Sequence, residues 1–325
     1  MGLNVPSLQL FCCAKNIGVD FSETIMLGRQ KISMPMSDVG AILSKIGVSR
    51  NELSNLEWGQ FAEPIFELLG AKQVSSLDAS AYENATYNHD LNAPLAEHLR
   101  ENFSVVFDGG TLEHIFNIPQ ALKNCMEMVR LGGHFIQVNN ANNYMGHGFW
   151  QFCPELLYRV FSLENGFLIK AVLLHEQLNT PAGNAPPGAW QGASFGNWYA
   201  VRDPAIVRSR VELINHRPTL ICIIAQRKSR ANIFANAPQQ SDYVVVWNQD
   251  RQTPTSASLA SISSPLPSTS SLLRRLLRSW IKSILQSIKN AFSRKGPFDR
   301  PYYCYVSDDD LVSGRFFGAI YIWQR

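Results

Sequence analysis

The segment from residue 104 to residue 116 constrains the fold more than any other part of this 325-residue chain. It reads Ser-Val-Val-Phe-Asp-Gly-Gly-Thr-Leu-Glu-His-Ile-Phe, so a short apolar run ends in an acid and two glycines before a helix-type pattern begins. This transition is typical of a parallel strand that delivers its C-terminal end to a ligand crevice. The segment therefore predicts an α/β sheet with a binding site at its strand ends.

Strand and helix patterns alternate on both sides of this segment. Strands are predicted over 23–28, 73–78, 87–92, 104–108, 134–138, 167–174 and 218–226, and helices over 36–46, 58–69, 95–101, 118–129 and 154–161. Parallel strands need crossover connections, so this alternation predicts a Rossmann-like, doubly wound, mostly parallel sheet covered on both faces. Residues 179–198, rich in Gly, Pro, Asn and Ala, are expected to form a long loop that could cover a pocket.

The composition changes after residue 230, and the predicted organisation follows these changes. The sheet domain is assigned to 1–230, an extension with a Ser/Thr/Pro-rich linker to 231–270, a basic amphipathic helix to 271–295 and a C-terminal tail to 296–325. The linker composition cannot bury enough apolar surface to order itself. We therefore expect a globular domain followed by a tethered helix.

The amphipathic segment 271–295 combines an apolar stripe with a local charge of +7 and no acid, in a chain whose net charge is +3. Its basic residues are Arg274, Arg275, Arg278, Lys282, Lys289, Arg294 and Lys295. This pattern favours an interfacial helix on an anionic membrane surface, and the alternative is a helix that packs on the core. We expect the full chain, but not a chain ending near residue 252, to sediment with anionic vesicles. Nucleic acid is a poorer third partner, because the average charge is small.

The cysteines and the apolar runs point to a reduced, cytoplasmic setting, with peripheral membrane contact as an option. Six cysteines are scattered without a C-x-x-C pair, which argues against zinc and disulfides, and no metal ligands are predicted. No run approaches the roughly 18 apolar residues of a membrane span, and the first residues do not resemble a signal peptide.

The strand-end motifs taken together resemble class I S-adenosylmethionine-dependent methyltransferases, and in particular their small-molecule branch. The series comprises Asp78, Asp90-Leu91, the run Asp108-Gly-Gly-Thr-Leu-Glu-His114 and Leu131-Gly-Gly133, and it covers residues 20–230 in the family's order and approximate spacing. A Leu-Glu-His step often follows the fourth strand in that branch. The resemblance implies S-adenosylmethionine as cofactor.

The same resemblance assigns cofactor-binding residues. Asp78 would accept hydrogen bonds from the ribose hydroxyls, and Asp90 with Leu91 would contact adenine. Asp108, Gly109 and Gly110 would border the crevice, where glycine lets the backbone approach a ligand closely.

The loop after the first strand departs from the family pattern. The family usually has an acid and a Gly-x-Gly-x-Gly loop there, whereas this chain reads Met26-Leu-Gly28-Arg-Gln-Lys31. Either Gly28 and Arg29 contact the methionine part of the cofactor in a modified way, or the cofactor site is lost.

Three residues are candidates for the catalytic step. Glu113 and His114 could orient an acceptor hydroxyl or take its proton, and His147 lies in a polar and aromatic loop, 139–151, that would face the acceptor. Tyr144 and Trp150 would be walls of that pocket, with Gln151 as a further polar candidate. The structural alternatives are that Glu113 caps a helix, that His114 packs beside it and that the loop only forms turns.

These features predict an enzyme that transfers a methyl group to a heteroatom, preferably oxygen, of a small-molecule or glycan acceptor. The alternative is a non-catalytic binding or scaffold protein that keeps the fold without the cofactor loop. A dinucleotide-dependent oxidoreductase is disfavoured, because Gly-x-Gly-x-x-Gly is missing after the first strand.

Overall fold

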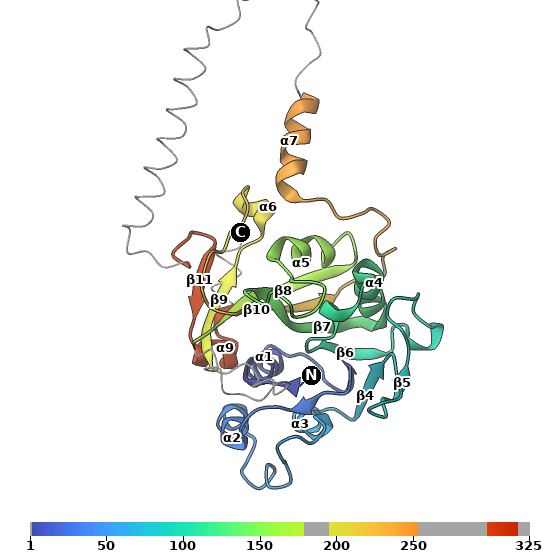
Figure 1. The fold of residues 1–325 in the computed structure, drawn as a ribbon, viewed down its shortest axis with the longest axis vertical. Coiled ribbons are helices and arrows are strands. Elements are labelled where there is room, and N and C mark those ends of the chain that lie inside the picture. Colours follow the sequence, from blue (N-terminus) through green and yellow to red (C-terminus); the bar gives the residue numbers. More distant parts are fainter. Residues whose placement is uncertain (1, 179–194, 253–297, 318–325) are drawn as a thin grey trace, which may run out of the picture.

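A computed structural model describes residues 2–178, 195–252 and 298–317. Within them, a sheet of nine strands has the order β11-β9-β8-β10-β7-β6-β2-β4-β5 (Figure 1). The strands are β2 (Glu23–Leu27), β4 (Gln73–Asp78), β5 (Tyr87–Asn88), β6 (Phe103–Asp108), β7 (Val129–Asn142), β8 (Phe167–Gln177), β9 (Gly196–Val201), β10 (Thr219–Arg227) and β11 (Tyr303–Val306).

The five strands β5, β4, β2, β6 and β7 are mutually parallel, and along the chain they are the third, second, first, fourth and fifth strands of this sheet. This is the strand order of a doubly wound sheet, with its switch point between β2 and β6. β10 runs antiparallel to both β7 and β8, so β8 has the direction of the parallel half. The predicted Rossmann-like, mostly parallel sheet is confirmed.

Helices cover both faces of the sheet (Figure 1). One face carries α4 (Ile118–Met128) and α5 (Pro154–Val160), and the other carries α1 (Val5–Asn16), α2 (Met36–Ser44), α3 (Glu63–Leu68) and α9 (Asp308–Ser313). Side chains alternate between the two cores along each strand: Val105 and Phe107 enter one, and Val106 enters the other. A short parallel pair, β1 (Gly2–Leu3) and β3 (Lys31–Ile32), lies outside the main sheet.

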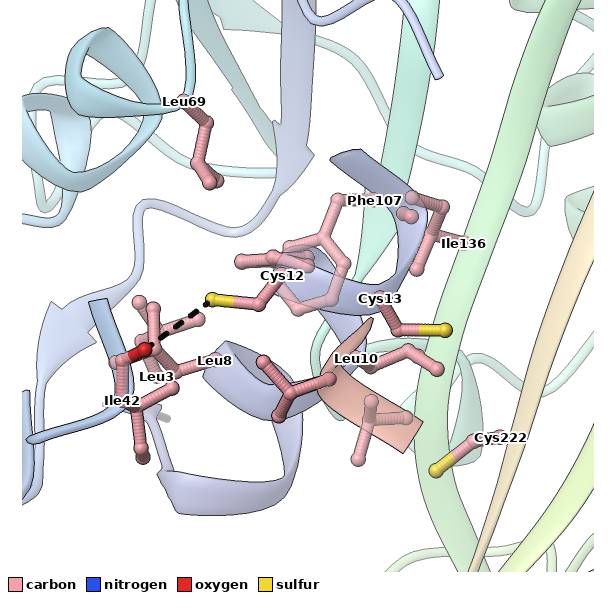
Figure 2. Close-up of a cluster of buried hydrophobic side chains, with 14 of the residues drawn as sticks. Leu3, Leu8, Leu10, Cys12, Cys13, Ile42, Leu69, Phe107, Ile136 and Cys222 are labelled. Carbon is pink, nitrogen blue, oxygen red and sulfur yellow. Dashed lines mark hydrogen bonds between the residues drawn. The ribbon is translucent and has the colours of Figure 1, made fainter. Parts of the chain in front are cut away.

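Helix α1, which the sequence analysis does not predict, lies at the centre of one core. It starts with Asn4 as N-cap, whose side chain accepts a hydrogen bond from the Ser7 amide at 3.0 Å. Figure 2 shows Cys13 directed towards Ile136 and Cys222 of the sheet, while Cys12 points the other way towards the Ile42 carbonyl of α2. A helix that is buried on all sides has no polar face, so its sequence lacks the amphipathic stripe by which helices are recognised.

Two predicted helices are much shorter in the structure. The helix expected over 58–69 is only α3, because Pro64 favours the first turn of a helix and fixes its start. The helix expected over 95–101 is a single 3-10 turn, η1 (Glu97–Leu99), and Glu101 beyond it has a φ of 55°. A left-handed residue cannot continue a right-handed helix, so the helical pattern ends there.

The C-terminal part of the chain completes the fold. β11 pairs with β9, and the Asn16 side chain of α1 donates to the Val312 carbonyl of α9 at 2.6 Å. The sequence analysis sets 296–325 apart as a tail, whereas 298–317 extend the sheet and cover α1. Residues 196–198, predicted as part of a loop, belong to β9.

The extension after β10 contains α7 (Ser241–Gln252), which projects away from the sheet (Figure 1). The backbone amide of Ser241, the first residue of α7, donates a hydrogen bond to the Glu155 carboxylate of α5 at 2.8 Å. The greater part of the predicted pocket loop, most of the linker and the amphipathic helix 271–295 lie outside the described residues. Among the residues that are described, no helix is long and apolar enough to cross a membrane.

Candidate active site

The ends of four neighbouring strands meet at one edge of the sheet. Leu27 of β2 is in register with Leu77 of β4 and with Asp108 of β6, and Asp108 is in register with Gln137 of β7. All four strands run in the same direction, so the loops that follow them form one surface. The predicted site residues of these loops therefore lie on the same edge of the sheet.

Asp108 is fully buried and its carboxylate is bonded to the protein. Oδ1 accepts from the backbone amides of Thr111 at 2.8 Å and Leu112 at 3.3 Å, and Oδ2 accepts from the Asn139 side chain at 2.9 Å. Burial raises the pKa of Asp108 to about 6. The residue holds the turn that presents Glu113, which is a different task from the predicted cofactor contact.

Glu113 and His114 belong to a 3-10 turn, η2 (Leu112–His114), which is separated from the two glycines by Thr111 alone. The Oε1 atom of Glu113 lies 3.8 Å from Nε2 of His114 and 3.7 Å from Nε2 of His147. The Glu113 side chain is 1% exposed, whereas those of His114 and His147 are 42% and 26% exposed. The structure thus brings the three predicted catalytic residues together, with the acid inside and the imidazoles at the surface.

Burial and the nearby charge of Asp108 raise the pKa of Glu113 to about 8. Burial also lowers the pKa of both histidines, and for His114 the charge of His147 adds to this. The Oε2 atom of Glu113 is buried without a hydrogen-bond partner in the described structure. A buried carboxylate with a shifted pKa at a strand-end crevice is typical of a functional site.

Backbone contacts fasten the 139–151 loop to the Glu113 turn. The Glu113 carbonyl accepts from the amides of Phe149 at 2.7 Å and Trp150 at 3.3 Å, and the Trp150 indole donates to the Ile115 carbonyl at 2.8 Å. Gly148 has a φ of 83°, and a Cβ there would lie 2.7 Å from the Glu113 carbonyl oxygen. Glycine is needed at this position, because only a residue without a side chain allows this approach.

The remaining residues of the 139–151 loop have separate roles. The hydroxyl of Tyr144 accepts from Gln177 at 2.6 Å, and the Gln151 side chain accepts from the Tyr144 amide at 3.2 Å. Gln151 therefore shapes the turn. Two exposed aromatic side chains lie close to the histidines in the sequence: Phe149 stacks edge-to-face on Phe116 at 5.8 Å, with both rings largely exposed.

The acids predicted to bind the adenosine part lie at the other end of this edge. Asp78 is half-buried, and both of its hydrogen bonds, from the amide and hydroxyl of Ser80, use Oδ1. Asp90 is exposed and accepts from Asn92. Leu91 is 3% exposed and packs in the core, so its side chain faces away from solvent.

The loop after β2 is built differently from a glycine-rich loop. Gly28 has a φ of 66°, and a Cβ there would meet the Thr111 hydroxyl at 3.2 Å. The Arg29 guanidinium forms an ion pair with Glu63 at 2.7 Å and lies over the Phe61 ring, so its charge is already compensated within the protein.

Gln30 is a site residue that the sequence analysis missed. Its side chain is 1% exposed and lies next to both Gly28 and Gly109, the residues that directly follow β2 and β6. Its Nε2 donates to the Leu27 carbonyl at 2.9 Å, and its Oε1 is buried without a partner in the described structure. Gly110 has a φ of 94°, and the amides of Thr111 and Leu112 that follow it donate to Asp108. No sequence motif marks an isolated glutamine for such a role.

Comparisons with known proteins add structural neighbours. No family model and no curated protein matches the sequence. A provisionally assigned methyltransferase from Bacillus halodurans is 12% identical with a TM-score of 0.37, and the match covers 70% of this chain and 100% of that one. A methyltransferase from Thermotoga maritima, described as a possible histamine N-methyltransferase, is 13% identical with a TM-score of 0.34 over 69% of this chain and 89% of its own.

A third neighbour is the branched-chain polyamine synthase from Thermus thermophilus, solved with N4-aminopropylspermidine and 5'-methylthioadenosine. It is 16% identical with a TM-score of 0.34, over 74% of this chain and 63% of its own. At these identities the likeness concerns the fold alone.

Proposed function

We propose that this chain, which has the Rossmann-like fold of class I S-adenosylmethionine-dependent methyltransferases, transfers a methyl group from S-adenosylmethionine to an oxygen or other heteroatom of a small-molecule or sugar acceptor. The observation that supports this most is the Glu113, His114 and His147 cluster at the same sheet edge as Asp78. Incubation with labelled cofactor and acceptors bearing phenolic or sugar hydroxyls tests the proposal, with S-adenosylhomocysteine release as readout.

The residues at the strand ends fit the polar groups of the cofactor. The unpartnered Gln30 Oε1 is an acceptor for the methionine ammonium group, and the Asp78 carboxylate is an acceptor for the ribose hydroxyls. A buried acceptor without a donor is costly, so a ligand that supplies the donor is stabilised there. The bound cofactor supplies the activated methyl group, and the protein supplies orientation and the exclusion of water.

The acceptor side of the proposal rests on Glu113 and its neighbours. In its ionised form, which predominates above its pKa of about 8, the buried Glu113 carboxylate next to two partly exposed imidazoles can accept the proton of an acceptor hydroxyl and pass it towards solvent. The exposed rings of Phe116 and Phe149 offer an apolar surface for the rest of the acceptor. These features favour a small acceptor with one polar reacting group.

Replacing Asp78 by alanine is expected to weaken S-adenosylmethionine binding by about 1–3 kcal/mol, because the ribose hydroxyls lose their charged partner. This corresponds to a rise in Kd of about 5- to 150-fold. Isothermal titration of the purified variants measures it. The Asp78→Asn variant keeps an acceptor for Ser80 and removes the charge, so it separates cofactor contact from turn stability.

The matched control for this prediction is Asp309→Ala, which removes an exposed acid of α9. Its cofactor affinity should equal that of the unaltered chain. Equal affinity in Asp78→Ala as well would remove Asp78 from the cofactor site.

The alternative function is a non-catalytic binding or scaffold protein. It is favoured by the single glycine after β2 and by Arg29, which is held by Glu63 and Phe61. In that case the Gln30 side chain replaces the cofactor in the crevice. Cofactor titration separates the two functions, because only the enzyme binds S-adenosylmethionine.

We further propose that the segment 271–295 binds anionic membrane surfaces, which would suit a lipid-linked or membrane-proximal acceptor. Its seven basic residues, without an acid, support this, since each Lys or Arg near an anionic surface contributes about 1 kcal/mol, and salt screens the contribution. The full chain is expected to sediment with phosphatidylserine vesicles at low salt and to be released as salt is added.

Ending the chain near residue 252 would also delete β11 and α9, which belong to the folded domain. The better variant is the full chain with Arg274, Arg275, Arg278 and Lys282 changed to glutamine. It should lose most vesicle binding, while the same number of exposed basic residues changed elsewhere should not matter. Undiminished sedimentation of the glutamine variant would reject the membrane proposal.

A further inference from the structure

Two histidine side chains and one carboxylate come together at the Glu113 turn. Among the described residues, Glu113, His114 and His147 are the one group of three whose candidate ligand atoms all lie within 4.8 Å of one another. The distances from Glu113 Oε1 to the two histidine Nε2 atoms, 3.8 and 3.7 Å, are too long for hydrogen bonds. The three side chains converge without bonding directly to one another through these atoms.

These distances suit a shared ion. A divalent ion with bonds of about 2.0–2.2 Å to imidazole nitrogen and carboxylate oxygen separates tetrahedral ligands by about 3.3–3.5 Å. Closing the two Glu113–histidine distances to those values needs movements of a few tenths of an ångström. Two imidazoles and one carboxylate are a donor set for zinc or ferrous ion, in sites that keep open positions.

A second observation concerns Glu113 itself. Its Oε2 atom is buried and has no hydrogen-bond partner in the described structure, although the side chain is 1% exposed. An unpaired buried carboxylate oxygen is costly. A cation held by Glu113 would compensate that cost.

The surroundings hold the three ligands in place. The amides of Phe149 and Trp150 donate to the Glu113 carbonyl, and the Asn140 side chain donates to the His147 carbonyl at 3.2 Å. The first two bonds tie the loop that carries His147 to the turn that carries Glu113, and the third braces the loop itself. Ligand positions fixed by a hydrogen-bonded shell are typical of metal sites.

We propose that Glu113, His114 and His147 bind one divalent transition-metal ion, with Zn²⁺ as the probe that fits the donor set. The partial exposure of His114 and His147 leaves the outer coordination positions open to water or to an acceptor oxygen. A role of the ion in methyl transfer rests on the proposed function, whereas binding of the ion does not. From the sequence no metal is predicted, because the cysteines form no C-x-x-C pair and because Glu113 and His147 are far apart along the chain.

Metal binding is measured on the full-length, tag-free protein without cofactor or acceptor. After chelator treatment, calorimetric titration with Zn²⁺ should give one ion per chain. Removing an outer-shell partner of a metal site costs about 10- to 100-fold in affinity, so losing a direct ligand in Glu113→Gln or His147→Ala should cost at least about 100-fold. His216→Ala, which removes an exposed histidine elsewhere, is the matched control and should bind as the unaltered chain does.

Co²⁺ substitution identifies the ligands independently. Visible bands of a nitrogen- and oxygen-ligated ion should appear in the unaltered chain and vanish in His147→Ala, with unfolding curves showing that the variant is folded. No binding, unchanged affinity in both ligand variants, or a thiolate charge-transfer band from the exposed Cys153 or Cys304 would each overturn the proposal. None of these outcomes depends on whether the protein binds S-adenosylmethionine.

Discussion

The Glu113→Gln variant is expected to transfer methyl groups about 10²- to 10⁴-fold more slowly than the unaltered chain, the range over which a positioned acid–base group acts. Glutamine has nearly the same shape, so it fits the same buried position between His114 and His147. It can neither accept a proton from the acceptor nor hold a cation by charge. The rate constant at saturating cofactor and acceptor measures the loss.

Two controls accompany this variant. Glu97→Gln changes a side chain that is 90% exposed at the far edge of the sheet, and its rate should be unchanged. Binding of S-adenosylmethionine to Glu113→Gln should stay close to normal, because Glu113 is proposed to act on the acceptor and not on the cofactor. A rate within a few-fold of the unaltered chain would remove Glu113 from the reaction.

The Phe11→Ala variant is expected to lose about 3–5 kcal/mol of unfolding free energy, the usual cost of removing a buried ring and leaving a cavity. Phe11 is fully buried in α1, and its ring lies 5.0 Å from that of Phe66 and 4.6 Å from that of Phe107. The ring therefore joins α1 to α3 and to β6, the strand that ends in Asp108. Urea unfolding followed by circular dichroism measures the change.

The matched control removes an aromatic ring from the surface. Tyr82 is 89% exposed, and Tyr82→Ala should change the unfolding free energy by less than about 0.5 kcal/mol. A similarly small effect of Phe11→Ala would mean that α1 is not part of the stable core.

The strand ends of the site could be predicted from the sequence because they are local features. The bounds of β4 are those expected, and β6 differs from the expected strand by one residue. An apolar run that stops at an acid predicts both the strand and the residue at which the strand ends. The register of β2 with β4 and β6 then brings Asp78 and Asp108 to one edge.

Other features depend on contacts between distant segments and leave no local pattern. Gln30 is significant only because its side chain lies beside Gly109. The carboxylate of Asp108, predicted as a ligand contact, accepts hydrogen bonds from Thr111, Leu112 and Asn139. Sequence alone identifies an acid at a strand end, but not which neighbours complete its hydrogen bonds.

The C-terminal strand and helix were missed for a similar reason. β11 and α9 are short, with bounds Tyr303–Val306 and Asp308–Ser313, and they follow a long Ser/Thr/Pro-rich and basic stretch. Their place beside β9 and α1 is set by packing partners far earlier in the chain. A prediction based on local sequence patterns does not include these distant partners, so it assigns such a segment to a tail.

The central claim is that this sheet edge binds S-adenosylmethionine although the loop after β2 has a single glycine. Calorimetric titration of the purified full-length protein with S-adenosylmethionine tests it most directly. We predict saturable binding of one cofactor per chain, competed by S-adenosylhomocysteine and weakened in Asp78→Ala. A folded protein that gives no binding heat at millimolar cofactor would contradict the account and favour the non-catalytic alternative.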